Sequence, residues 1–191
     1  MLSTGPASGD DRRLGPGRVA YYAARYIAAL GGVDELIFSD AQPARAMAMA
    51  ETLNQLFHGR PRCEALANGH LPETDVLMFA TTSTRPVSKA GDVRTKLIVS
   101  VGADTEEQHE LAESWVTAGD LYVDCLDSAR VGDVRAWVAA GLVQETQLTD
   151  LLGLLRRGAK PTNGHPVIFI STGSALFDNL TLAYLLDHLG R

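Results

Sequence analysis

A short glycine pattern near the start of the sequence has the residue types and spacing of a phosphate-binding turn. The stretch Gly15-Pro-Gly17-Arg18-Val19-Ala20 reads G-x-G-x-x-A and leads directly into a segment of helical period. Gly15 permits a tight turn, Gly17 lets the backbone approach a pyrophosphate, and Ala20 allows the helix to pack closely. The pattern predicts a dinucleotide contact that includes Arg18 and Val19. A chance pair of glycines before a helix is the alternative.

An acidic residue lies at the spacing where such a turn needs a second contact. Asp40 ends the segment Glu35 to Asp40, which is the next strand expected after the glycine turn. A carboxylate here is typical of a hydrogen bond to the adenosine ribose hydroxyls, and it would repel a 2′-phosphate. NAD is therefore favoured over NADP as the cofactor. The alternative is that Asp40 caps the helix that Pro43 opens.

Hydroxyl side chains cluster after a further expected strand. The loop Ala80-Thr81-Thr82-Ser-Thr-Arg-Pro86 follows the apolar run Val76 to Ala80. Ligands of parallel α/β sheets bind outside the carboxyl ends of the strands, so this loop can offer hydroxyl and backbone donors to a cofactor. A plain turn rich in Ser and Thr is the alternative.

A glycine and an acid follow the long apolar run Lys96 to Val101. In Val101-Gly102-Ala103-Asp104 the carboxylate stands at the end of a buried strand, where partial desolvation would raise its pKa toward proton transfer. The alternative is that Asp104 caps a helix that begins near Glu106.

The elements that must position these residues are apolar runs that alternate with segments of helical period. Nearly continuous apolar strands separated by helices indicate a parallel sheet covered on both faces. The expected fold is therefore a doubly wound, Rossmann-like α/β domain. Expected strands are 35–40, 76–80, 96–101, 121–123 and 167–170, and expected helices are 19–30, from Pro43 to Phe57, 148–158 and 176–189.

Composition excludes several classes of protein. The 191 residues are 46% hydrophobic and 21% charged, and the net charge of -6 comes without basic clusters, so nucleic acid is not an expected partner. No apolar run is long enough to span a bilayer and no leader pattern is visible, so a cytoplasmic location is expected. Cys63 and Cys125 are expected to be free thiols, and the five histidines have no metal-ligand spacing.

Three stretches together resemble successive signatures of the ornithine cyclodeaminase/μ-crystallin family. They are Thr81-Thr-Ser-Thr-Arg-Pro-Val87, Val101-Gly-Ala-Asp104 and Ser171-Thr-Gly-Ser-Ala-Leu-Phe-Asp178, and their order and spacing match as well as their content. The resemblance covers the chain from Gly15 onward. The segment Leu2 to Gly9 is also similar to the family's RTGAxSG segment, which precedes the nucleotide domain.

The resemblance implies NAD(P)-dependent chemistry at the α-carbon of a small amino or imino acid. Members include cyclodeaminases, ketimine reductases and alanine dehydrogenases, in which the cofactor exchanges a hydride with that carbon. Asp104 matches the family's proton donor and acceptor. Ser171 matches a cofactor-contacting serine and Thr172 lies where the backbone approaches the substrate, while Thr81, Thr82 and Val101 fall in the family's cofactor loops.

The sequence also departs from the family. Members are longer, because an N-terminal region supplies the substrate pocket and the dimer interface. Ser3 stands where an arginine is expected, and Gln108 stands at a position that is often lysine. The first strand that normally feeds the glycine turn is collapsed into residues 10–13. We therefore expect residues 1–14 to be the remnant of a connection to a substrate and dimerisation domain, and residues 15–191 to form the dinucleotide-binding domain.

Two classes of function follow from the resemblance and its departures. The first is an NAD-dependent oxidoreductase or cyclodeaminase that works as a homodimer or with a separate chain supplying the substrate domain. The second is a non-catalytic family member that acts as a nucleotide-binding or interaction module.

Overall fold

The structure is a computed structural model that describes residues 17–66, 71–158 and 164–189. The chain divides into two compact units, the first ending at Leu71 and the second beginning at Pro72. Each unit is described by itself below. The predictions for Gly15, for Ser3, for residues 1–14 and for the missing first strand lie outside the described residues.

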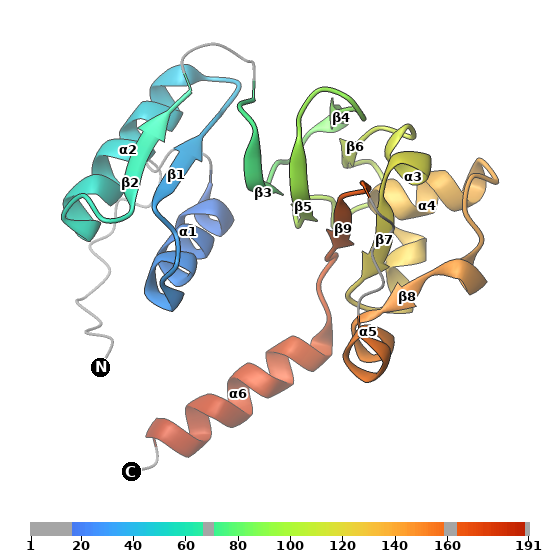
Figure 1. The fold of residues 1–191 in the computed structure, drawn as a ribbon. Coiled ribbons are helices and arrows are strands. Elements are labelled where there is room, and N and C mark those ends of the chain that lie inside the picture. The colour runs from blue at the N-terminus through green and yellow to red at the C-terminus, as the bar shows by residue number, and fades with distance from the viewer. Residues whose placement is uncertain (1–16, 67–70, 159–163, 190–191) are drawn as a thin grey trace. The chain divides into compact units, whose positions relative to one another are not determined.

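The first unit is a small α/β unit with a two-stranded parallel sheet. Its elements are α1 (Arg18–Leu30), β1 (Glu35–Phe38), α2 (Pro43–Phe57) and β2 (Arg62–Ala65). Figure 1 shows α2 beside this sheet, and the unit has a core of its own. The core consists of Ala24, Phe38, Ala46, Met49, Ala50, Leu53 and Cys63.

The two strands of this unit are held in register by charge as well as by the backbone ladder. Glu35 lies opposite Arg62, whose guanidinium also contacts Glu64. The apolar stripe that the helical period predicts on α1 is solvent-exposed at Tyr22 and Tyr26. In the part of the chain that the structure describes, this apolar face of α1 is therefore partly open to solvent.

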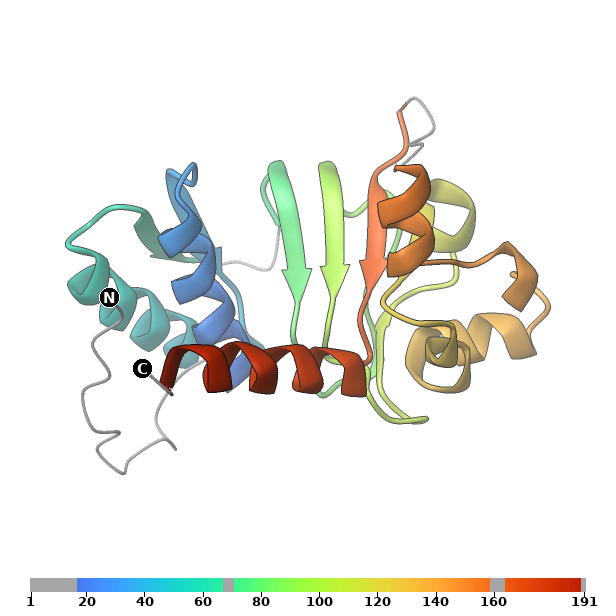
Figure 2. The same cartoon turned by 90° about the horizontal axis from the view of Figure 1, so that it is seen from below.

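The second unit contains a five-stranded parallel sheet in the order β3-β5-β9-β7-β8. Figure 2 shows the arrows of β3, β5 and β9 running in the same direction. The strands are β3 (Thr74–Phe79), β5 (Thr95–Ser100), β7 (Asp120–Val123), β8 (Thr149–Asp150) and β9 (Val167–Ile170). The helices are α3 (Trp115–Ala118), α4 (Gly132–Ala139), α5 (Leu151–Arg157) and α6 (Ala175–Leu189), with 3₁₀ turns at Leu126–Arg130 and Glu145–Gln147.

A second, two-stranded parallel sheet joins β4 (Thr84–Ser88) to β6 (His109–Leu111). Because β4 follows β3 and β6 follows β5, this small sheet lies beyond the carboxyl ends of those two strands. Short links therefore connect the central sheet to the small sheet at residues 80–83 and 101–108. These links contain four of the six site residues that the sequence predicts in this unit, namely Thr81, Thr82, Val101 and Asp104.

The predicted α/β class with a parallel sheet is confirmed, and the predicted strands and long helices occur within a few residues of their expected bounds. Central strand residues such as Ile98 and Ile168 are fully buried, as their continuous apolar runs predict. Trp115 and Trp137 are also buried. Among the described residues, no helix is long and apolar enough to cross a membrane.

Two local expectations are wrong. No helix begins near Glu106, because residues 105–107 form a turn that leads into β6. The stretch Thr84-Arg85-Pro86 is not part of a loop but begins β4, whose register with β6 shifts between Thr84 and Ser88. Proline lacks a backbone donor, and short edge strands with irregular register are where a sheet tolerates it.

Candidate functional site

The predicted site residues fall into one group in each unit. Gly17, Arg18, Val19, Ala20 and Asp40 belong to the first unit. Thr81, Thr82, Val101, Asp104, Ser171 and Thr172 belong to the second unit and all follow carboxyl ends of strands of the central sheet. The two groups are described separately.

Gly17 has a backbone conformation that suits the predicted phosphate turn. It is the N-cap of α1 with φ of 99° and ψ of 163°, a region that side chains other than glycine rarely adopt. The N-cap Gly17 has no side chain to cap α1, and Arg18, Val19 and Ala20 contribute the backbone N–H groups of its first turn. A helix start of this kind favours an anion.

Asp40 lies two residues beyond β1, at the start of α2. Its Oδ1 accepts a hydrogen bond of 2.8 Å from the Gln42 N–H, and its Oδ2 lies 3.9 Å from Nε of Arg45. The alternative that Asp40 caps α2 is wrong, because Gln42 is the N-cap and no side chain caps this helix; Asp40 instead orders the backbone just before it. The ribose contact is not in conflict with these contacts of Asp40, because a carboxylate oxygen can accept more than one hydrogen bond.

Backbone hydrogen bonds place the remaining predicted residues along a single edge of the central sheet. The Val101 N–H donates to the Phe79 carbonyl at 3.0 Å, and the Ser171 N–H donates to the Ser100 carbonyl at 2.8 Å. The Asp124 N–H extends the series by donating to the Ile170 carbonyl at 3.0 Å. The segments that follow β3, β5, β9 and β7 are therefore neighbours at the edge where ligands of parallel sheets bind.

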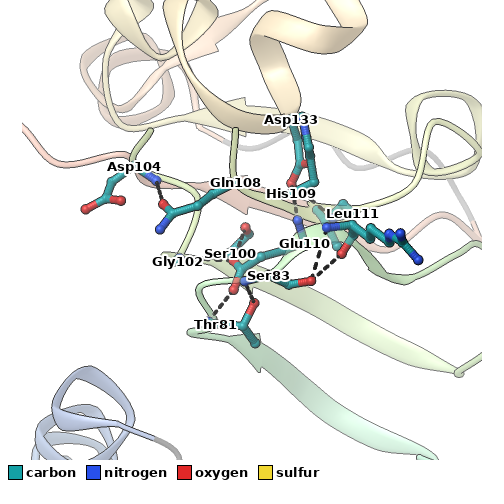
Figure 3. Close-up of polar contacts among 11 residues, drawn as sticks. Thr81, Ser83, Ser100, Gly102, Asp104, Gln108, His109, Glu110, Leu111 and Asp133 are labelled. Carbon is teal, nitrogen blue, oxygen red and sulfur yellow. Dashed lines mark hydrogen bonds and ion pairs between the residues drawn. The ribbon is translucent and has the colours of Figure 1, made fainter. Parts of the chain in front are cut away.

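The Asp104 loop is tightly held although its carboxylate is not. Ala103 is buried, and the Gly132 N–H at the start of α4 donates to the Thr105 carbonyl at 3.0 Å. The Asp104 N–H donates to Oε1 of Gln108 at 3.1 Å. Figure 3 shows the Asp104 side chain extending away from the cluster around Glu110.

Two expectations for Asp104 are therefore corrected. It does not cap a helix, since its neighbours form a turn, and it is exposed rather than partly buried. Its loop leaves the sheet at a strand end and contacts the start of α4 through Ala103 and Thr105, while the Asp104 side chain faces solvent. Gln108 orders this loop, because its Oε1 accepts from the Asp104 N–H.

The carboxylate of Glu110 ties the loops after β3 and β5 to each other. Oε1 accepts from the Thr81 N–H at 2.5 Å, and Oε2 accepts from the Gly102 N–H at 3.0 Å and from the Ser100 hydroxyl at 2.6 Å. Figure 3 shows these bonds converging on the side chain from two strands. Glu110 has no exposed surface. Thr81 is half-buried beside the Glu110 carboxylate, whereas Thr82 is exposed.

Asp124 makes a second carboxylate anchor at the ends of β7 and β9. Its Oδ2 accepts from the Ser171 hydroxyl at 2.9 Å and from the N–H groups of Thr172 and Gly173 at 3.0 and 2.9 Å. Its Oδ1 accepts from the Ser128 hydroxyl at 2.6 Å, which in turn contacts the Thr172 hydroxyl at 3.0 Å. The predicted cofactor residue Ser171 and substrate residue Thr172 thus share one fixed loop.

A third buried acid holds β6 from the other side. Asp133 accepts from the N–H groups of Glu110 and Leu111 at 3.0 Å each, and His109 Nδ1 lies 3.1 Å from its Oδ1. Burial raises the pKa of Asp133, and the backbone donors and His109 oppose that rise. The group is a structural support for β6, whose Glu110 side chain points to the opposite side.

Comparison with protein-family models matches residues 13–190 to the ornithine cyclodeaminase/mu-crystallin family. The chain belongs to this family. The match covers both units and all the described site residues, and it confirms the resemblance that the three sequence stretches indicate.

Two curated relatives that the chain resembles are named as imino acid reductases. It is 28% identical over 170 residues to iminosuccinate reductase of Paracoccus denitrificans, covering 86% of this chain and 52% of the relative. It is 23% identical over 180 residues to Delta(1)-pyrroline-2-carboxylate reductase of Bacillus cereus, covering 91% of this chain and 55% of the relative. The chain thus spans about half the length of the curated relatives it matches.

Solved structures share the fold. The Paracoccus denitrificans iminosuccinate reductase in complex with NAD+ matches with a TM-score of 0.75 at 26% identity, over 93% of this chain and 56% of that one. The Thermococcus litoralis Delta(1)-pyrroline-2-carboxylate reductase in complex with NADH and L-proline matches with a TM-score of 0.75 at 23% identity, over 92% and 57%. The Rossmann-like assignment of the parallel sheet is confirmed by these matches.

The sequence analysis missed Glu110 and Asp124. Asp124 had a usable signal, because it follows the apolar run of β7 directly, as Asp104 follows β5 within a few residues. Glu110 had none, since a lone acid in the polar stretch before Leu111 gives no periodicity and no spacing to a known ligand. Its role depends on β6 folding back over the ends of β3 and β5.

Proposed function

We propose that this chain is the nucleotide-binding part of an NAD-dependent oxidoreductase that acts at the α-carbon of a small amino or imino acid. The observation that supports it most is the edge of the central sheet, where hydrogen bonds fix the loops of Thr81, Asp104 and Ser171 side by side. The relatives are named as imino acid reductases, and solved neighbours contain NAD+ or NADH.

The residues present fit a dinucleotide. The first turn of α1, opened by the glycine-only conformation of Gly17, suits a pyrophosphate, and Asp40 suits the adenosine ribose. We assign Thr81, Thr82, Val101 and Ser171 to the remaining contacts. When bound, the nicotinamide would exchange a hydride with the α-carbon of the substrate.

Asp104 would move the proton that accompanies this exchange. Its exposed carboxyl group would donate a proton to the substrate nitrogen when an imine is reduced, and its carboxylate would accept that proton in the reverse direction. The loop contributes positioning, because its backbone is fixed by Gln108 and by Gly132 while the side chain reaches outward. Thr172, held by Asp124, would approach the substrate through its backbone.

Titration calorimetry of the purified chain with NAD and then with NADP tests the cofactor assignment. We expect saturable binding that prefers NAD. Asp40→Asn keeps an oxygen for the Gln42 N–H but removes the charge, so the preference for NAD over NADP should fall about tenfold, equivalent to about 1.4 kcal/mol. Asp34→Ala removes an exposed carboxylate of the same unit and should change neither affinity. Absence of heat with either nucleotide at millimolar concentration would refute the assignment.

Turnover tests the role of Asp104. With Delta(1)-pyrroline-2-carboxylate and NADH as probes, Asp104→Asn should lower kcat by about 10²- to 10⁴-fold while the affinity for NADH is kept. Glu106→Gln is the matched control, since it neutralises an exposed carboxylate two residues away that pairs with Arg135 at 3.1 Å. Equal rates in the Asp104 variant and the wild type would rule out proton transfer by this group.

A second function is favoured by the exposure of the Asp104 carboxylate. No described residue of the second unit buries this side chain, so a non-catalytic chain that binds the nucleotide without turnover is the alternative. NAD binding without measurable reduction by the purified chain would support it. We propose that in the catalytic case a second copy of this chain, or a separate chain, completes the amino or imino acid pocket.

A further inference from the structure

Glu110 is a fully buried acid whose oxygens are divided between two loops. Oε1 serves the Thr81 N–H after β3, and Oε2 serves the Gly102 N–H and the Ser100 hydroxyl at the end of β5. A buried carboxylate is costly unless hydrogen bonds compensate its lost hydration. Here all three compensating donors belong to the two segments that lead to the predicted cofactor and proton-transfer residues.

The packing around this carboxylate leaves no room for adjustment. A Cβ added to Gly102 would overlap the Thr81 backbone and Oε1 of Glu110. The Thr81 backbone and the Glu110 carboxylate therefore both lie in close contact with Gly102. A closely packed junction transmits a shift of one loop to the other.

The backbone of Glu110 is itself held by a second buried acid, Asp133. The Glu110 N–H donates to Asp133 Oδ2, and the neighbouring Leu111 N–H donates to the same oxygen. Because Asp133 belongs to α4, the position of Glu110 is fixed by that helix as well as by β6. The junction is thus rigid at its base.

We propose that Glu110 is a positioning residue that sets the place of the Asp104 loop relative to the Thr81 loop. This inference rests on the proposed function, since it assigns the Thr81 loop to the nucleotide and the Asp104 loop to proton transfer. Glu110 acts through the hydrogen bonds that it accepts from the Thr81 and Gly102 N–H groups and from the Ser100 hydroxyl. This side chain therefore links nucleotide binding at one loop to proton transfer at the other.

Glu110→Gln tests the link with little change of volume. The amide carries one oxygen and one NH₂ group, so in either orientation the NH₂ group faces the N–H of Thr81 or of Gly102. We expect the backbone amide of at least one of these residues to exchange with solvent about tenfold faster or more, measured by NMR hydrogen exchange. The amides of Ile168 and Ile170 in β9 should keep their rates. NAD affinity, measured by calorimetry, should fall about tenfold.

Asp150→Ala is the matched control for a general loss of stability. Asp150 accepts from the Gly153 N–H at 2.7 Å as the N-cap of α5, so its loss costs stability at another place in the same unit. This variant should leave NAD affinity unchanged. Ser100→Ala removes the hydroxyl donor to Glu110 but neither backbone donor, so both loop amides should keep their protection.

The outcomes separate the inference from the proposed function. If the wild type binds NAD, and the Glu110→Gln variant has the same amide exchange rates and the same NAD affinity as the wild type, the positioning role is overturned. If amide exchange in Glu110→Gln rises uniformly over the unit, the variant reports only a general loss of stability. Glu110 then has only a structural role and the inference also fails. If exchange rises only at Thr81 or Gly102 while NAD affinity is kept, the link to the nucleotide is refuted. A wild type that binds no NAD overturns the proposed function and the inference together.

Discussion

Asp104 and Glu110 are acids six positions apart with opposite surroundings, one exposed and one without exposed surface. The difference arises because the loop between them turns over and returns as β6. The Asp104 side chain faces solvent, whereas the Glu110 carboxylate accepts hydrogen bonds from donors of the chain. Two acids close together in the sequence thus have different surroundings at the same end of the sheet.

At the scale of the residue, we predict that Gly102→Ala destabilises the chain. The added methyl would overlap the Thr81 backbone and the Glu110 carboxylate, so the free energy of unfolding should fall by about 1–3 kcal/mol. Urea unfolding followed by circular dichroism measures it. Thr82→Ala, at an exposed position of the adjoining loop, should stay within about 0.5 kcal/mol of the wild type. Equal losses in the two variants would contradict the close approach.

The two cysteines should differ in reactivity. Cys63 is 3% exposed and burial raises the pKa of its thiol, while Cys125 is half-buried. Because the thiolate is the reactive form, Cys125 should react with an aromatic disulfide reagent at least about tenfold faster than Cys63 in the native chain. In Cys125→Ser the fast phase should disappear, and unfolding in urea should expose the remaining thiol. A fast phase that persists in this variant would show that Cys63 is accessible.

Asp133 gives a pH dependence whose sign is set by burial. An acid whose pKa is raised in the folded state stabilises the fold in its protonated form. This contribution is complete at pH values below the ordinary pKa of 3.8 and is lost as the pH rises through the raised pKa. The unfolding free energy of the wild type relative to Asp133→Asn should therefore decrease from about pH 3 toward pH 7. The comparison is made in a His109→Gln background, with and without Asp133→Asn, so that the imidazole facing Asp133 makes no contribution. A difference that grows with pH would contradict the raised pKa.

At the scale of the element, the sequence predicts the long and apolar segments well. The helices α1, α2 and α6 and the strands β5 and β9 follow from continuous or periodic apolar residues. The elements that were missed include short polar strands such as β2, which begins at Arg62, and β6, which begins at His109. Their pairing is decided by neighbours in space, so a single sequence carries no local signal for them.

Helix α5 offers an element-scale prediction. It follows β8 with no intervening loop, and Asp150 satisfies the Gly153 N–H of its first turn. Asp150→Ala should lower the free energy of unfolding by about 1 kcal/mol, and Asp150→Ser should restore most of it, because serine also caps helices. Thermal unfolding by calorimetry compares the three chains. An alanine variant as stable as the wild type would show that the cap contributes nothing.

At the scale of the whole molecule, each of the two units has its own buried core. Leu53 in the first and Ile98 in the second have no exposed surface. Truncation of either to alanine should cost about 2–5 kcal/mol in the unit that contains it. Hydrogen exchange of Leu53→Ala should therefore speed up in α2 and leave β5 unchanged, with the reverse in Ile98→Ala. Uniform acceleration across both units would mean that they unfold as one.

The candidate site was predictable in part for the same reason as the fold. Asp104 and Thr81 stand next to apolar strands, and the rule that ligands bind at carboxyl ends of parallel strands selects them, whereas Ser171 was predicted from the family resemblance. The exposure of Asp104 and the buried role of Glu110 depend on how the loop between them folds. The sequence does not encode that path in any local pattern.

The strand order β3-β5-β9-β7-β8 has a consequence for how the chain is made. The strand β9 lies between β5 and β7, yet it follows both of them along the chain. While the ribosome is still adding residues before Val167, β5 and β7 have no strand to join them and each keeps an open edge. The central sheet can therefore close only after Ile170 has left the exit tunnel, and a nascent chain stalled before that point carries unpaired edges suited to aggregation or to capture by a chaperone.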